Sequence, residues 1–148
     1  LVLSTLHTNT AAGAITRLQD LGVDSFLLAS TIRGILSQRL LRKLCHHCRQ
    51  PVEPNEFNRD LLKLEVGHKI YEAAGCEKCN STGYAGRQAL FELVSVDAQL
   101  QTLIHENAGE IELESKIRED VPSIREAGFS LVRDGMTTIE EVLRVTSV

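Results

Sequence analysis

The chain has 148 residues, of which 43% are hydrophobic but only 4% aromatic, so we expect a folded protein with a core of aliphatic side chains. Its formal net charge of -4 gives no bulk electrostatic support to nucleic-acid binding, so no nucleic-acid partner is expected. No apolar run approaches the roughly 18 residues that a membrane span needs, and we find no signal peptide. The composition therefore predicts a soluble, cytoplasmic chain with no direct membrane insertion.

The first third of the chain predicts a strand, two helices and a second strand. Residues 1–6 form a short apolar run typical of a buried parallel strand. A buried strand is a poor place to begin a domain, so we expect this one to belong to a sheet largely encoded upstream. Residues 8–10 offer capping side chains for a helix over 11–21, and a second helix, capped by Asp24 or Ser25, is expected over 26–36. Residues 38–44 are interpreted as a strand, and this order fits the end of an α/β sheet.

The last third of the chain predicts a strand followed by helices. A strand is expected over 88–96, after two turn glycines. The helices that follow are expected over 97–104, with Asp97 as the capping residue, over 110–119, over 124–134 and from 138 onward. Thr138 and Glu141 have the spacing of a capping box, in which each side chain accepts a hydrogen bond from the other residue's backbone N–H.

All four cysteines of the chain fall in two Cys-x-x-Cys pairs, which are Cys45 with Cys48 and Cys76 with Cys79. A two-residue gap lets both thiolates of a pair bind one ion, and two such pairs complete a tetrahedron. This pattern predicts a structural Zn²⁺ site, because four protein ligands leave no open position for a substrate. The interval between the pairs leaves room for a helix around 60–66.

Other uses of the cysteines remain open. Two disulfides are disfavoured because nothing marks the chain as secreted, and a redox role would need only one Cys-x-x-Cys pair. A histidine could replace one thiolate, although four cysteines are the simpler ligand set; the nearby histidines are His46, His47 and His68. Four thiolates on Zn²⁺ carry a double negative charge, which nearby cations could offset. These cations are Arg42, Lys43, Arg49 and Lys78.

His7 follows the first predicted strand. In open α/β sheets, ligands bind at the carboxyl ends of strands, and Ser4, Thr5, Thr8 and Asn9 supply further hydrogen-bonding groups there. A lone histidine is weak evidence of a site. Spacing alone favours the simpler interpretation, in which residues 8–10 only cap the helix and His7 is a surface residue.

Three stretches together resemble the type II secretion and type IV pilus assembly ATPases. They are 3–11 (LSTLHTNTA), 38–48 (QRLLRKLCHHC), and 86–93 (GRQALFEL) with 135–145 (GMTTIEEVLRV). The resemblance covers essentially the whole chain and implies an α/β to α+β fold. Its expected parts are the C-terminal end of a RecA-like P-loop ATPase core over 1–44, a four-cysteine zinc module over 45–86, and a mainly helical subdomain over 87–148.

The resemblance also implies a function for the full-length protein. That protein would be a cytoplasmic homo-hexamer, peripheral at the inner membrane through secretion platform proteins, that uses ATP and Mg²⁺ to drive pseudopilus or pilus assembly. His7 would belong to the family's histidine box beside the nucleotide. Gln38, Arg39 and Arg42 would lie near the nucleotide or a subunit boundary, and the four cysteines would be the metal ligands. Residues 26–30 favour the secretion branch, with pilus assembly as the alternative.

The sequence contains no Gly-x-x-x-x-Gly-Lys-Ser/Thr loop, which supplies the backbone donors and lysine that bind nucleotide phosphates. It also lacks an acidic Mg²⁺-binding strand. We therefore predict that this chain alone does not hydrolyse ATP. Two alternatives come from other functional classes. One is a zinc-binding protein-interaction module with no motor role, and the other is a thiol oxidoreductase with a lowered thiol pKa and no metal.

Overall fold

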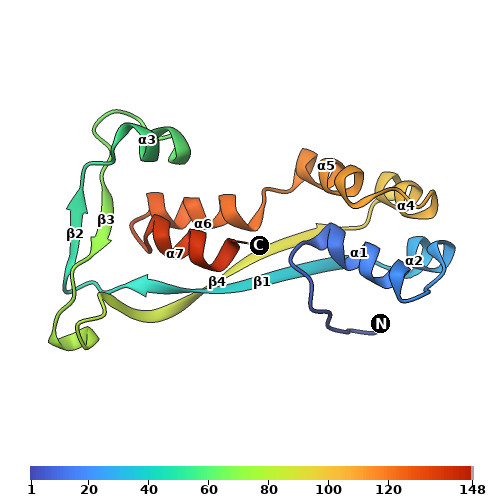
Figure 1. Ribbon diagram of the computed structural model, residues 1–148, viewed down its shortest axis with the longest axis horizontal. Coiled ribbons are helices and arrows are strands. Elements are labelled where there is room, and N and C mark those ends of the chain that lie inside the picture. Colours follow the sequence, from blue (N-terminus) through green and yellow to red (C-terminus); the bar gives the residue numbers. More distant parts are fainter. Residues whose placement is uncertain (148) are drawn as a thin grey trace. The chain divides into compact units, whose positions relative to one another are not determined.

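The computed structural model describes residues 1–147, which form a mixed α/β structure (Figure 1). Its four described strands pair in two two-stranded sheets, β1 with β4 and β2 with β3. In chain order the elements are α1 (Ala11–Asp20), α2 (Ser25–Thr31), β1 (Gly34–Leu44), β2 (Arg49–Val52), α3 (Glu56–Leu62), β3 (Ile70–Ala73), the 3₁₀ turn η1 (Glu77–Cys79), β4 (Tyr84–Ser95), α4 (Ala98–His105), α5 (Glu110–Asp120), α6 (Ile124–Arg133) and α7 (Ile139–Thr146).

The described residues divide into two compact units, each made of two stretches of chain. The first, called here the N-terminal unit, contains residues 1–37 and 91–123. The second, called here the cysteine unit, contains residues 38–90 and 124–147. Strands β1 and β4 contribute residues to both units. The domain boundaries expected at 44/45 and 86/87 stay a prediction.

The core of the N-terminal unit is aliphatic, as the composition predicts. Its buried residues are Ala11, Ala12, Ile15, Leu28, Ala29, Val94, Val96, Leu100, Ile104, Leu113 and Ile117. Three helices begin at capping residues that the sequence indicates. The side chains of Thr10, Asp24 and Asp97 accept hydrogen bonds from the backbone N–H groups of Gly13, Phe26 and Leu100, at 2.8 Å each. These caps fix where α1, α2 and α4 start.

The cysteine unit has a separate core, in which α6 and α7 pack together. Its buried residues are Leu41, Leu62, Ile70, Leu90, Phe129, Val132, Ile139 and Val142. A Cβ atom added to Gly128 would lie 2.6 Å from Cγ1 of Val142, so glycine is what lets α7 approach α6 this closely. Strands β2 and β3 are antiparallel, with Arg49 opposite Ala73 and Val52 opposite Ile70.

The expected strand over 1–6 is wrong for this structure. These residues have no regular secondary structure, and the side chains of Leu1, Val2 and Leu3 are exposed. A strand needs a neighbour for its backbone hydrogen bonds, and the described strands pair only with one another. The apolar pattern alone therefore could not form a strand here.

Other boundaries also differ from those that the sequence predicts. Helix α2 ends at Thr31, not at 36, because the chain from Gly34 pairs with β4. The helix expected around 60–66 begins earlier, at Glu56, where Asn55 caps it by accepting a hydrogen bond from Asn58 N–H at 2.7 Å. Strand β4 begins at Tyr84, four residues before the expected start. None of the helices in the described part of the chain combines the length and apolar content needed to cross a bilayer.

Candidate metal centre

Two short turns bring the four cysteines together. Cys45 and Cys48 lie on the turn between β1 and β2, where the N–H of Cys48 donates to the carbonyl of Cys45 at 3.2 Å. Cys76 and Cys79 lie at the 3₁₀ turn after β3, where the N–H of Cys79 donates to the carbonyl of Cys76 at 3.1 Å. Because β2 pairs with β3, the first turn and the second turn meet at the same end of this sheet.

The sulfur positions fit a tetrahedral metal ion. The Sγ atoms of Cys45 and Cys76 are 4.0 Å apart, those of Cys48 and Cys79 are 3.8 Å apart, and those of Cys76 and Cys79 are 3.7 Å apart. All four sulfurs lie within 4.8 Å of one another. Zn–S bonds of about 2.3 Å place the sulfurs of a tetrahedron about 3.8 Å apart. The four side chains could therefore hold Zn²⁺.

The same separations exclude the disulfide alternative for this structure. A disulfide bond joins its sulfurs at about 2.05 Å, far below the 3.7 Å between Cys76 and Cys79. None of the four cysteines forms a disulfide bond. The sulfurs of the two Cys-x-x-Cys pairs therefore form one cluster, as the spacing predicts.

Backbone groups and two glycines close the chain around the sulfur of Cys79. This Sγ accepts hydrogen bonds from the N–H groups of Cys76 and Gly83, each at 3.2 Å. Gly83 has a φ of +76°, and a Cβ there would lie 2.5 Å from the Cβ of Ala73. Gly75 has a φ of +93°, and a Cβ there would lie 2.7 Å from a backbone oxygen. Side chains at these two positions would push the second turn open.

The surroundings of Cys79 and Cys48 shift the pKa values of their thiols in opposite directions. Burial raises the pKa of Cys79, but the N–H groups of Cys76 and Gly83 and the neighbouring thiols outweigh it and lower this pKa to about 6. For Cys48, burial and the neighbouring thiols raise the pKa to about 12. The cluster thus holds one thiolate readily and resists more negative charge. Full ionisation of the set needs a bound cation to compensate the charge.

Two of the cations expected to offset the thiolate charge have other partners. The guanidinium of Arg42 pairs with Glu141 at 2.7 Å and lies 4.1 Å from the ring centre of Tyr84. Arg49 donates from Nη1 to the carbonyl of Gly135 at 2.6 Å and lies 4.5 Å from the ring centre of Tyr71. Arg42 therefore links β1 to α7, and Arg49 links β2 to the turn after α6.

The nearby histidines have separate positions. His46 and His47 are exposed. Nε2 of His68 lies 3.2 Å from the carbonyl oxygen of Arg133. Within the described part of the chain, the group of side chains that can share one metal ion consists of the four cysteines.

Sequence reasoning missed the role of Glu141, whose side chain is 0% exposed. Its carboxylate accepts hydrogen bonds from the backbone N–H of Arg42 at 2.8 Å, from Nη2 of Arg42 at 2.7 Å and from Nη2 of Arg144 at 2.6 Å. Burial raises the pKa of Glu141, but the hydrogen bonds from Arg144 and Arg42 outweigh it and lower this pKa to about 2. Glu141 is therefore a buried, charged link between α7 and β1.

This link corrects the predicted capping box. Thr138 does cap α7, since its Oγ1 accepts a hydrogen bond from the N–H of Glu141 at 3.2 Å. The carboxylate of Glu141, however, binds the two arginines. Glu141 and Arg144 are three residues apart on one helix, and this spacing could have predicted their ion pair. The partnership with Arg42 could not have been predicted from spacing, because Arg42 lies 99 residues away in the sequence.

The residues expected near a nucleotide fall in different units. Gln38 is exposed and Arg39 half-buried on β1, where Arg39 Nη1 donates to the carbonyl of Gln38 at 3.2 Å. His7 is exposed in the N-terminal unit, within a segment that has no regular secondary structure. The structure thus brings the four cysteines together, whereas the nucleotide roles of His7, Gln38, Arg39 and Arg42 stay predictions.

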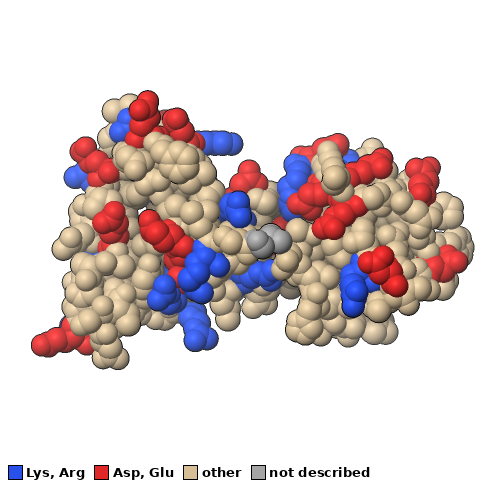
Figure 2. Space-filling model, in the orientation of Figure 1, with Lys and Arg blue, Asp and Glu red and all other residues tan. Residues whose placement is uncertain are grey.

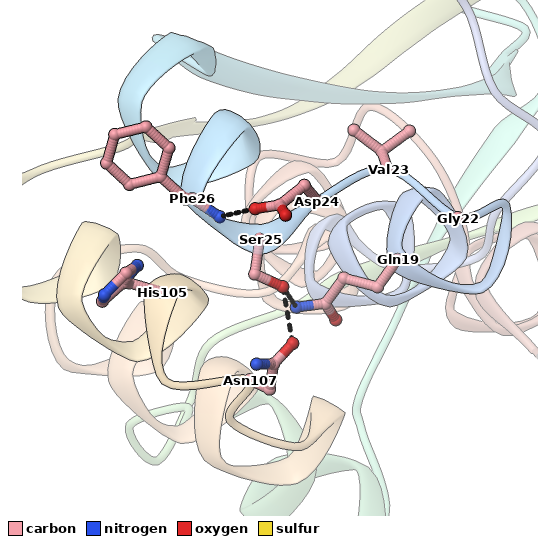
Figure 3. A pocket seen from close by; sticks show the side chains of 8 residues that line it. All are labelled: Gln19, Gly22, Val23, Asp24, Ser25, Phe26, His105 and Asn107. Atoms are coloured by element: carbon pink, nitrogen blue, oxygen red, sulfur yellow. Dashed lines mark hydrogen bonds between the residues drawn. The ribbon is translucent and has the colours of Figure 1, made fainter.

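The N-terminal unit contains an open hollow of about 360 Å³, shown in Figure 3. Ser25 donates to Oδ1 of Asn107 at 2.5 Å and accepts from Nε2 of Gln19 at 3.2 Å, while Asp24 caps α2. These hydrogen bonds join α1 and α2 to the turn after α4, so we interpret the hollow as a helix junction.

Acidic side chains gather over α5 (Figure 2), whose sequence EIELESKIRED supplies five carboxylates.

Comparison with known proteins gives a consistent result along the chain. The family model described as type II/IV secretion system protein matches residues 1–144. The chain is 51% identical over 148 residues to the type II secretion system ATPase E of Vibrio cholerae. It is 47% identical to the type II secretion system protein E of Pseudomonas aeruginosa and 44% identical to a putative type II secretion system protein E of Escherichia coli K12. These matches cover 99% of this chain but only 29–30% of each relative, so the chain spans about 30% of their length.

Proposed function

Because the chain belongs to the type II/IV secretion system protein family, we propose that it is the C-terminal part of a cytoplasmic ATPase that powers type II protein secretion. The observation that carries this proposal is the 51% identity, over 99% of the chain, to a relative named as a secretion ATPase. In the proposed full-length protein, ATP hydrolysis drives pseudopilus assembly. The protein works as a homo-hexamer held at the inner membrane by secretion platform proteins.

The proposed ATPase core is RecA-like and includes residues 1–44. His7 belongs to its histidine box, beside the nucleotide. Gln38, Arg39 and Arg42 lie near the nucleotide or the subunit boundary. ATP and Mg²⁺ bind only in the full-length protein, because this chain has no loop of the phosphate-binding type. The exposure of His7 and Gln38 supports the proposal, since a group that meets a nucleotide or a neighbouring subunit must be reachable.

The proposed cofactor of the cysteine unit is a structural Zn²⁺ ion held by Cys45, Cys48, Cys76 and Cys79. Sulfur separations of 3.7 to 4.0 Å support this assignment. When bound, the ion supplies the positive charge that lets all four thiols ionise. The chain's own residues position the sulfurs. Strands β2 and β3 align the two cysteine turns, and the N–H groups of Cys76 and Gly83 orient the sulfur of Cys79.

The test uses the full-length protein, obtained by extending the coding sequence upstream of Leu1. We expect it to hydrolyse ATP and to contain one zinc ion per chain, and we expect the 148-residue chain alone to contain zinc but to release no phosphate. Steady phosphate release by the 148-residue chain would contradict its predicted inactivity. A full-length protein with no nucleotide turnover would contradict the motor assignment while leaving the zinc assignment intact.

The secretion and pilus branches are separated by complementation. The full-length gene would be introduced into a bacterium that lacks its own secretion ATPase and into one that lacks its pilus assembly ATPase. We expect exported enzymes to reappear in the medium of the first strain, because the relatives compared above are named as type II secretion proteins. Restored pili in the second strain, without restored secretion, would assign the chain to the pilus branch.

A further inference from the structure

The turn that joins α6 to α7 is held by residues that flank the cysteines. This α6–α7 turn, residues 134–138, contacts three of them. The N–H of Leu44, next to Cys45, donates to the carbonyl of Met136 at 2.8 Å. Nη1 of Arg49, next to Cys48, donates to the carbonyl of Gly135 at 2.6 Å.

The third contact comes from the second cysteine pair. The hydroxyl of Tyr84 lies 2.9 Å from Oγ1 of Thr138. Tyr84 directly follows Gly83, whose N–H donates to the sulfur of Cys79. Since Thr138 is the N-cap of α7, this hydroxyl reaches the residue that starts the helix. Both cysteine pairs are therefore linked to one turn.

The α6–α7 turn also fits tightly against β2 and β3. Gly135 has a φ of +67°, and a Cβ added there would lie 2.6 Å from Cδ2 of Tyr71 and 3.3 Å from Nη1 of Arg49. Thr137 is 0% exposed, and its Oγ1 donates to the carbonyl of Arg42 at 2.9 Å. A turn that is this closely packed cannot keep its position if the two cysteine turns move apart.

We propose that occupancy of the cysteine site by its metal ion positions helix α7, through the α6–α7 turn. This inference rests on the zinc site proposed above and goes beyond it, because it gives the ion an effect on a helix that carries no ligand. With the ion bound, Leu44, Arg49 and Tyr84 hold the turn. Without it, the thiol-bearing turns loosen, the three contacts weaken, and the start of α7 opens more often.

The test measures amide hydrogen exchange of the full-length protein before and after zinc removal by a chelator, with zinc content measured on the same samples. We expect removal to speed exchange in the first turns of α7 by about tenfold, the factor expected from losing one or two net hydrogen bonds. Helix α5, which lies in the other unit with its own core, serves as the internal reference and should keep its exchange rates.

Two tyrosine variants sharpen the test. Tyr84→Phe removes the hydroxyl that meets Thr138 and keeps the ring under Arg42. We expect this variant to retain zinc, to exchange faster at the start of α7, and to respond less to the chelator than the parent protein. Tyr71→Phe is the matched control, because its ring contact with Arg49 is preserved, and it should respond as the parent does.

The outcomes separate the two proposals. Zinc release with unchanged exchange in α7 would overturn the positioning role and leave the zinc site standing. Equal acceleration in α5 and α7 would also overturn it, because the ion would then act on the whole protein. A protein that never contains zinc would overturn the metal assignment itself, and the positioning role with it.

Discussion

The two units differ in whether the side chains that the sequence predicts to be functional lie close to partner groups in the structure. In the cysteine unit, four thiols face one another within 4.8 Å, and the buried carboxylate of Glu141 is held by two arginines. In the N-terminal unit, His7 is exposed on a segment without regular secondary structure. The cysteine site comes from two local turns aligned by one small sheet, so its geometry can be tested in this chain. The nucleotide role of His7 stays a prediction, to be tested in the full-length protein.

The largest expected effect comes from removing one of the four proposed metal ligands. Cys79→Ser deletes the thiol with the lowered pKa, the one that two N–H groups orient. We expect the purified variant to lose its zinc and to be destabilised by more than about 4 kcal/mol, because metal binding and folding are linked in small metal sites. Elemental analysis gives the metal content, and thermal unfolding gives the stability.

The matched control for this substitution is His47→Ala. His47 lies between Cys45 and Cys48, two of the proposed ligands, but its side chain is exposed. The control should keep one zinc ion per chain and nearly its full stability. If His47→Ala lost the metal while Cys79→Ser kept it, the four-cysteine ligand set would be wrong.

The next largest effect is expected at the buried carboxylate. Glu141→Gln removes the charge that Arg42 and Arg144 share, and breaking a buried pair costs about 3–5 kcal/mol. The arginine side chains are 45% and 58% exposed, so solvent reduces the expected loss to about 2–3 kcal/mol. Denaturant unfolding at neutral pH measures it. The exposed neighbour Glu140 provides the control, and Glu140→Gln should change stability by less than about 0.5 kcal/mol.

The pH dependence of this effect follows from the pKa of Glu141. Folding lowers this pKa from 4.5 to about 2, so the carboxylate contributes fully above pH 4.5 and progressively less as the pH falls toward 2. The stability difference between the parent protein and Glu141→Gln should therefore shrink over this range. A difference that stayed constant from neutral pH down to pH 2 would show that the carboxylate charge does not carry the link.

The cysteine spacing and the helix caps could be predicted because each depends on residues close in sequence. A Cys-x-x-Cys pair or a capping aspartate acts within four residues, and Asp24 and Asp97 cap helices as their patterns indicate. The partnership of Glu141 with Arg42 could not be predicted in this way, because it joins residues 99 positions apart. The strand expected over 1–6 failed for a related reason, since periodicity describes a segment and says nothing about its hydrogen-bonding neighbour.

A smaller effect is expected from the backbone of the second cysteine turn. Gly83→Ala places a Cβ 2.5 Å from the Cβ of Ala73 and in a left-handed backbone conformation, so a loss of about 2 kcal/mol is expected. Gly86→Ala is the matched control, because its φ of +81° is similar but the space around it is open. It should lose only about 1 kcal/mol. Equal losses in thermal unfolding would mean that the contact with Ala73 contributes nothing.

The smallest effect on stability is expected at His7, in the N-terminal unit, where a substitution should affect activity more than stability. His7 is exposed, so His7→Ala should change the unfolding free energy by less than about 0.5 kcal/mol. In the full-length protein the same change should lower the turnover number for ATP by about tenfold or more, because the proposed position beside the nucleotide would let His7 stabilise charge on the transferred phosphate. His46→Ala, another exposed histidine, is the control and should leave turnover unchanged. Full turnover in His7→Ala would instead favour the simpler interpretation, in which residues 8–10 only cap α1 and His7 is a surface side chain.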